Sequence, residues 1–143
     1  GLAGAECLSA ALQKNKTLDS LSLGGNNIGA GGAEWIAAAL QGNHVLTALR
    51  LDNNYLLAAG AKAISKALLS ANALTLLSLN ENYMFNAGAT YLAQGLKSNT
   101  ALLTLRLERN NIAAEGARDL SYALCLNQSL TCLDLGCNYI EPE

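Results

Sequence analysis

The stretch LTALRLDNNYL, residues 46–56, decides the fold because the chain repeats it. Equivalent stretches begin at Leu18, Leu74, Leu102 and Leu130, so successive copies start 28 residues apart. Each copy reads LxxLxLxxNx and ends on Ile, Leu or Met. A fixed period of this length is typical of repeat architectures, in which each unit buries its apolar face only against its neighbours.

A second kind of segment follows each of the first four copies and has the pattern of a helix. The segment GAKAISKALL, which begins at Gly60, places Ala61, Ile64 and Leu68 on one helical face. Similar segments begin at Gly4, Gly32, Gly88 and Gly116. The leucines of the LxL stretches alternate instead, which predicts a short strand with one face inward. Each repeat is therefore expected to hold one strand and one helix.

These units predict an α/β fold, a right-handed solenoid with parallel strands on its concave face and helices on its convex face. Strands stack about 4.8 Å apart and helices about 8–10 Å apart, so the stack curves into a horseshoe segment. We expect one domain over residues 1–143, with repeats starting at residues 18, 46, 74, 102 and 130. Residues 1–17 are the helical half of a preceding repeat, and the chain is expected to be a piece of a longer solenoid.

The glycine-rich stretch SLGGNNIGAGGAEW, residues 22–35, raises the alternative of a phosphate-binding loop. The repeat argues against it, because only the Gly32 position is glycine in all the equivalent segments. The spacing GxGxxG also fails, since Gly29-x-Gly31 is followed by Glu34, and no GK[ST] motif is present. We assign Gly32 a structural role, because a side chain there would hold the helix away from the sheet. No cofactor is expected.

One position is an asparagine in every repeat: Asn26, Asn54, Asn82, Asn110 and Asn138. An amide carries both donors and an acceptor, so we expect it to satisfy turn backbone groups of its own repeat and of a neighbour. A second asparagine recurs at the predicted helix ends, as Asn15, Asn43, Asn99 and Asn127. Only two of these lie in sequons (NKT and NQS), so we interpret the position as helix-end chemistry and not as a glycosylation site.

Composition and charge disfavour several function classes. The chain is 51% hydrophobic, has a net charge of -2 and holds no basic block, so neither nucleic acid nor a membrane is an expected partner. The four cysteines form no CxxC pair and accompany one histidine, His44, so we expect no metal site and reduced cysteines. Nucleophilic catalysis would depend on His44 alone. We therefore predict that the protein is not an enzyme and has no catalytic residues.

The pattern LxxLxLxxNxI followed by xxxGAxxLxxAL resembles the signature of the ribonuclease-inhibitor-like leucine-rich repeats, and it covers essentially all of residues 1–143. That class includes ribonuclease inhibitor, NOD-like receptors and the Ran GTPase-activating protein. The even period and the NKTL and NQSL junctions, at Asn15 and Asn127, look most like NOD-like receptor repeats. The resemblance implies a cytoplasmic binding scaffold with a role in innate immunity.

The positions between the strand leucines vary from repeat to repeat, so the scaffold does not dictate them. On a strand, these side chains point away from the core and onto the concave face. Arginine and tyrosine are common interface hot spots, and mixed charges favour specific pairing. The alternative is a solvated face whose charges neutralise one another. The predicted partner-binding residues are Arg50, Asp52, Tyr55, Leu76, Asn80, Glu81, Tyr83, Arg106, Glu108 and Arg109.

The leading hypothesis is a protein-recognition module that binds a partner on the concave face, like the sensor repeats of an intracellular NOD-like receptor. A second hypothesis is an enzyme regulator, either an inhibitor that plugs an active site or a Ran-type GTPase activator. A third is a scaffold or engineered repeat protein without a natural ligand. Neither end carries a polar capping unit, so end-to-end self-association is a further prediction.

Overall fold

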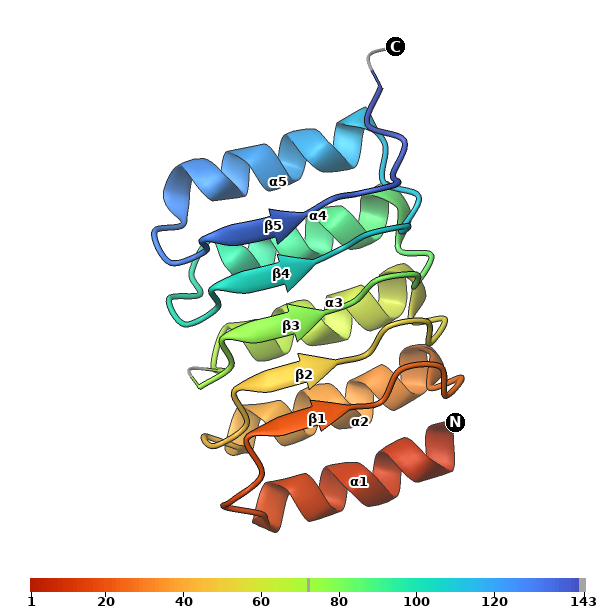
Figure 1. The fold of residues 1–143 in the computed structure, drawn as a ribbon, viewed down its shortest axis with the longest axis vertical. Helices are drawn as coiled ribbons and strands as arrows, with labels where there is room; N and C mark the ends of the chain where they lie inside the picture. The colour runs from red at the N-terminus through yellow and green to blue at the C-terminus, as the bar shows by residue number, and fades with distance from the viewer. Residues whose placement is uncertain (72, 142–143) are drawn as a thin grey trace.

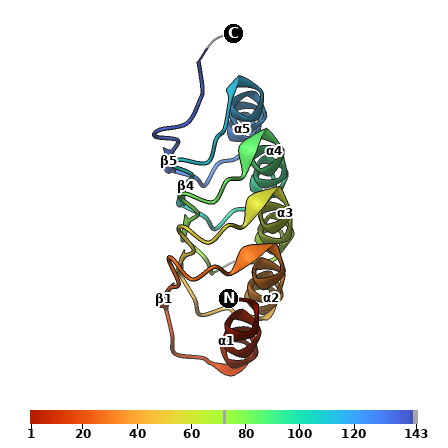
Figure 2. The ribbon, with the colours of Figure 1, turned by 90° about the vertical axis from the view of Figure 1, so that its right-hand side faces the viewer.

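The computed structural model describes residues 1–71 and 73–141, which form one sheet and one layer of helices (Figure 1). The sheet has five parallel strands in chain order: β1 (Ser20–Ser22), β2 (Ala48–Arg50), β3 (Leu76–Ser78), β4 (Thr104–Arg106) and β5 (Cys132–Asp134). The helices are α1 (Leu2–Lys14), α2 (Gly29–Gly42), α3 (Leu57–Leu68), α4 (Phe85–Leu96) and α5 (Ala114–Leu126). Figure 2 shows the helices stacked in one column and the strands in the other. The predicted α/β solenoid is confirmed.

The register of the sheet follows the repeat length. Leu49 of β2 pairs with Leu77 of β3, and Leu77 pairs with Leu105 of β4. These central leucines are completely buried. Each strand is only three residues long, so it turns one side chain toward the core and two toward the open face of the sheet. The open face is thus built from the variable positions of the repeat.

Glycine lets neighbouring helices approach at one repeated position. A Cβ added at Gly88 of α4 would lie 2.5 Å from the Met84 Cβ and 3.3 Å from the Ala61 Cβ of α3. These contacts come from the preceding turn and from the neighbouring helix, whereas the sequence predicts a contact with the sheet. At the same repeat position in α1, a Cβ on Gly4 would meet nothing within 4 Å.

The asparagine row holds the recurring turns and joins consecutive repeats through both the Nδ2 and the Oδ1 of the amide. The Asn82 Nδ2 donates to three carbonyl oxygens at 3.0 Å, one of which, on Leu51, belongs to the preceding repeat. The Asn82 Oδ1 accepts the backbone N–H groups of Asn54, at 3.0 Å, and Leu56, at 3.3 Å. As predicted, one buried side chain satisfies backbone groups of two repeats.

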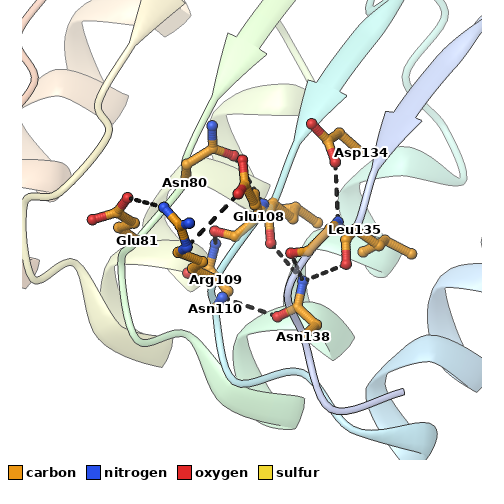
Figure 3. A network of polar contacts seen from close by, with 10 residues as sticks. Asn80, Glu81, Glu108, Arg109, Asn110, Asp134, Leu135 and Asn138 are labelled. Atoms are coloured by element: carbon orange, nitrogen blue, oxygen red, sulfur yellow. Dashed lines mark hydrogen bonds and ion pairs between the residues drawn. The ribbon is translucent and has the colours of Figure 1, made fainter. Parts of the chain in front are cut away.

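The hydrogen bonds of the asparagine row differ between the two ends of the described chain. The Asn110 N–H donates to the Asn138 Oδ1 at 2.9 Å (Figure 3). Asn26, in the first strand-bearing repeat, is exposed, and its Nδ2 donates to the carbonyl oxygens of Leu23 and Gly24 at 3.0 Å. Both acceptors belong to its own repeat.

The second asparagine position has the predicted role at the helix ends. The Asn43 Oδ1 accepts the N–H groups of Val45 and Leu46 at 2.9 and 2.8 Å, and its Nδ2 donates to the Leu12 carbonyl oxygen of the preceding repeat at 2.7 Å. Asn99 makes the equivalent contacts, including a bond from its Nδ2 to the Leu68 carbonyl oxygen of the preceding repeat. Side-chain amides therefore hold the loops at both ends of the strands.

Replacing Asn82 with alanine should lower the free energy of unfolding by roughly 1–3 kcal/mol, because the buried N–H groups of Asn54 and Leu56 in the preceding repeat lose their acceptor. Asn26→Ala is the matched control, and it should cost less because the Asn26 side chain is exposed and bonds within one repeat. Urea unfolding followed by circular dichroism measures both. Equal losses for the two variants would contradict the bridging role of the row.

Alanine at the repeated glycine should change stability in opposite directions in α4 and α1. Gly88→Ala should destabilise the protein, since its Cβ cannot lie 2.5 Å from the Met84 Cβ without a shift of the helix. Gly4→Ala should stabilise it by roughly 0.5–1 kcal/mol, the usual cost of glycine inside a helix. Thermal melting of both variants tests this pair, and a shift of the same sign in both would refute it.

Candidate protein-binding surface

Two arginines lie on the open face of the sheet. Arg50 of β2 and Arg106 of β4 flank Ser78 of β3 in register, so their backbones are two strands, roughly 10 Å, apart. Both arginines are partly exposed. Within the described part of the chain, neither of them forms an ion pair. Leu76, which is half-buried, adds an apolar side chain to the same face.

Asp52 and Asn80, two of the predicted partner-binding residues, tie neighbouring strands together. The Asp52 Oδ1 accepts the Ser78 hydroxyl at 2.5 Å and the Asn80 N–H at 2.9 Å. The Asn80 Oδ1 in turn accepts the Glu108 N–H at 2.8 Å. Ser78 is 1% exposed, so its hydroxyl depends on this acceptor. These bonds cross from one repeat to the next, which the pattern within one repeat does not reveal.

A charged cluster of Glu81, Glu108 and Arg109 lies where the strands run into the turns (Figure 3). The Arg109 Nη1 is 3.1 Å from the Glu81 Oε1, and its Nε is 3.7 Å from the Glu108 Oε1. The hydrogen bond to Glu81, and then the charge of Glu108, raise the pKa of the Arg109 guanidinium above its ordinary value. Arginine is already charged at neutral pH, so this shift creates no pH switch. Because the side chains are exposed to water, the pair orients the charges more than it stabilises the fold.

Tyr55 and Tyr83 stack on each other in the turns that follow β2 and β3. These turns and their equivalents in the other repeats form the turn edge of the sheet. Their ring centroids are 5.6 Å apart, with an angle of 5° between the planes. They are 50% and 44% exposed, so they form part of the surface and do not fill the core. Both residues have a left-handed backbone, with φ of 56° and 54°, which is uncommon for a bulky residue. The turn thus presents two large rings to solvent.

The structure brings some of the predicted residues together around one hollow of about 300 Å³. Its lining consists of Glu81, Tyr83, Arg109, Asn111, Cys137 and Tyr139. The prediction omits Asn111, Cys137 and Tyr139, although they occupy the same two repeat positions as Glu81 and Tyr83. The charged side chains of the turn edge and the arginines on the open strand face of the sheet belong to one variable surface.

Residues 1–71 and 73–141 contain no group of three or more His, Cys, Asp or Glu side chains that could hold a metal ion. The four cysteines, Cys7, Cys125, Cys132 and Cys137, are exposed and free. None of the helices described is both long enough and apolar enough to cross a bilayer.

Asp52→Ala should lower the free energy of unfolding by roughly 1–3 kcal/mol, because the buried Ser78 hydroxyl and the Asn80 N–H lose their acceptor. Asp52→Asn keeps an acceptor oxygen at the same place and should retain most of the stability. Chemical unfolding of the native chain and both variants measures the difference. If the two variants lose the same amount, the carboxylate charge matters and not the hydrogen bonds.

Comparison with known proteins agrees with this architecture. The family model described as "Leucine Rich repeat" matches residues 14–37, 98–121 and 126–143. No curated protein matches the chain significantly.

Two solved structures show the fold in other proteins. The leiomodin-1 structure described as "Actin-Binding Site 2 (ABS2)" superposes with a TM-score of 0.84 at 20% identity, over 94% of this chain and 78% of that one. The tropomodulin C-terminal domain of Caenorhabditis elegans gives a TM-score of 0.80 at 13% identity, over 92% and 81% of the two chains. At these identities the likeness concerns the fold alone. Together with the matched segments and the 28-residue register of the sheet, it establishes that the chain has the fold of a leucine-rich repeat solenoid.

Proposed function

We propose that the chain is a protein-recognition module that binds a partner protein on its strand face and along the adjoining turn edge. The observation that carries this proposal is the pair Arg50 and Arg106, which lie on the open face without an ion pair within the described part of the chain. The leucine-rich repeat fold and its structural neighbours favour a binding module over an enzyme.

The geometry of the face favours carboxylates of the partner as its ligands. A guanidinium presents a planar fork of donors that fits a carboxylate in a bidentate manner. The Ser78 hydroxyl between the two arginines already donates to Asp52, so the arginines are the available donors at the centre of the face. Two such forks, on strands roughly 10 Å apart, would match a partner with two acidic side chains. Leu76 supplies an apolar contact beside them.

We further propose that these repeats act like the sensor repeats of an intracellular NOD-like receptor, in the cytoplasm and in innate immunity. The support is the even 28-residue period and the NKTL and NQSL junctions. An enzyme regulator, of the ribonuclease-inhibitor or Ran GTPase-activator kind, is the alternative on the same scaffold. The likeness to a structure described as an actin-binding site of leiomodin-1 makes actin the first individual protein to test as a partner.

Charge reversal tests the proposed face. Arg50→Glu with Arg106→Glu should reduce the capture of a native partner by at least about tenfold, since two favourable pairs become repulsive. The matched control reverses Lys66 of α3 and Arg118 of α5, which are exposed on the helices, and it changes the net charge by the same amount. Quantitative mass spectrometry of proteins retained by each immobilised chain provides the measurement, and sedimentation with actin filaments examines actin separately.

The outcomes separate the hypotheses. Proteins lost from the strand-face variant and kept by the helix-face variant support the proposal and identify the partner. Capture that survives reversal of Arg50 and Arg106 but is lost in the control would place the binding surface on the helices instead. A GTPase assay with the native chain examines the activator hypothesis directly. End-to-end self-association stays a prediction, and sedimentation velocity at increasing protein concentration tests it.

A further inference from the structure

One repeat position forms a row of rings that is interrupted once. In chain order the position holds Asn27, Tyr55, Tyr83, Asn111 and Tyr139. Tyr55 and Tyr83, in consecutive repeats, stack with nearly parallel rings and 5.6 Å between centroids. Asn111 then takes the place of a ring, and Tyr139 follows in the next repeat. The row therefore lacks one ring between Tyr83 and Tyr139.

The missing ring leaves a space that nothing in the described chain fills. The hollow of about 300 Å³ is lined by Tyr83 and Tyr139, with Asn111 between them in the order of the repeats. Tyr139 is 65% exposed and Tyr83 is 44% exposed, so both rings offer surface to an incoming group. The short Asn111 side chain, which is half-buried, also lines the hollow.

We propose that this gap is a socket for one aromatic side chain of a partner protein, which would complete the row of rings. The identity of the guest as part of a protein rests on the proposed function, but the chemistry of the socket does not. The row would then continue from Tyr55 through Tyr83 and the guest ring to Tyr139. The socket lies at the turn edge, beside the charged cluster of Glu81, Glu108 and Arg109.

The lining favours a flat ring over other side chains. Aromatic pairs are most favourable in offset or edge-to-face arrangements at about 4.5–7 Å between centroids, the range in which Tyr55 and Tyr83 already lie. The Arg109 guanidinium, held by Glu81 at 3.1 Å, adds a cation for the face of the guest ring. An aliphatic side chain would lose both interactions.

Hydrogen bonds hold the backbone at Asn111 in place before any guest arrives. The N–H groups on both sides of Asn111, those of Asn110 and Ile112, donate to the Asn138 Oδ1 at 2.9 and 3.0 Å. Asn111 itself has a φ of 58°, a left-handed conformation that asparagine tolerates better than most residues. A rigid socket loses little conformational freedom on binding, which favours affinity.

The test uses N-acetyl-L-tyrosinamide as the guest, with ¹H–¹⁵N spectra of the full chain as the readout. We expect saturable, ring-current-sized shifts of the Asn111 and Tyr139 amides, with a dissociation constant on the order of 1 mM for so small a ligand. N-acetyl-L-leucinamide, which has the same amide but no ring, should cause no saturable shift. Absence of saturation by the tyrosine compound at about 20 mM, or equal binding of the leucine compound, overturns the proposal.

Two variants with the same substitution at the same repeat position provide the structural control. Asn111→Tyr fills the gap and should weaken binding of the tyrosine compound by at least about tenfold. Asn27→Tyr adds a ring beyond Tyr55, away from the gap, and should leave binding within about twofold. Both positions have a left-handed backbone, so the two variants impose a similar strain. Unchanged binding in Asn111→Tyr overturns the proposal.

A second pair covers the case in which Asn111→Tyr does not fold. Tyr139→Ala removes one wall of the socket and should abolish binding, while Tyr55→Ala removes a ring that does not line it and should preserve binding. The charge reversals at Arg50 and Arg106 should leave binding of the tyrosine compound unchanged. If those reversals abolish partner capture while the tyrosine compound fails to bind the native chain, the socket alone is wrong and the proposed function stands.

Discussion

The fold depends on the asparagine amide that bridges each repeat to the one before it. The strands are three residues long, so the ladder between two repeats is short. The Asn82 side chain adds five hydrogen bonds to this short ladder and distributes them over two repeats. An alanine would leave the buried N–H groups of Asn54 and Leu56 without their acceptor, whereas the three carbonyl oxygens would keep other donors. A substitution at this position is therefore costly.

Identical backbones in successive repeats place equivalent side chains in rows, and the rows explain the surface. Tyr55 and Tyr83 stack at 5.6 Å because both side chains leave the same left-handed turn, 28 residues apart. The distance between the two rings therefore follows from the distance between adjacent strands. A row of this kind is sensitive to single substitutions, since one short residue such as Asn111 opens a hollow of about 300 Å³ in it.

Some of the variable residues hold neighbouring repeats together, and others are available for binding. Asp52 and Asn80 lie next to the backbone N–H groups of the following repeat and accept hydrogen bonds from them, so they help to hold the sheet. Arg50 and Arg106 have no such role within the described residues, and Arg109 is paired only at the exposed edge. A binding surface in this fold is therefore assembled from the side chains that the cross-repeat contacts leave available.

The sequence by itself determined the repeat length, the alternation of strand and helix and the structural asparagines. Each of these is a periodic pattern set by local geometry, and the register of Leu49 with Leu77 bears it out. The arrangement of side chains at the candidate site could be established only from the tertiary structure. Which backbone N–H donates to the Asp52 carboxylate, which tyrosines stack and where the hollow opens all depend on contacts between residues about 28 positions apart. Such contacts depend on how the repeats stack in space, and the sequence pattern of a single repeat does not predict that packing.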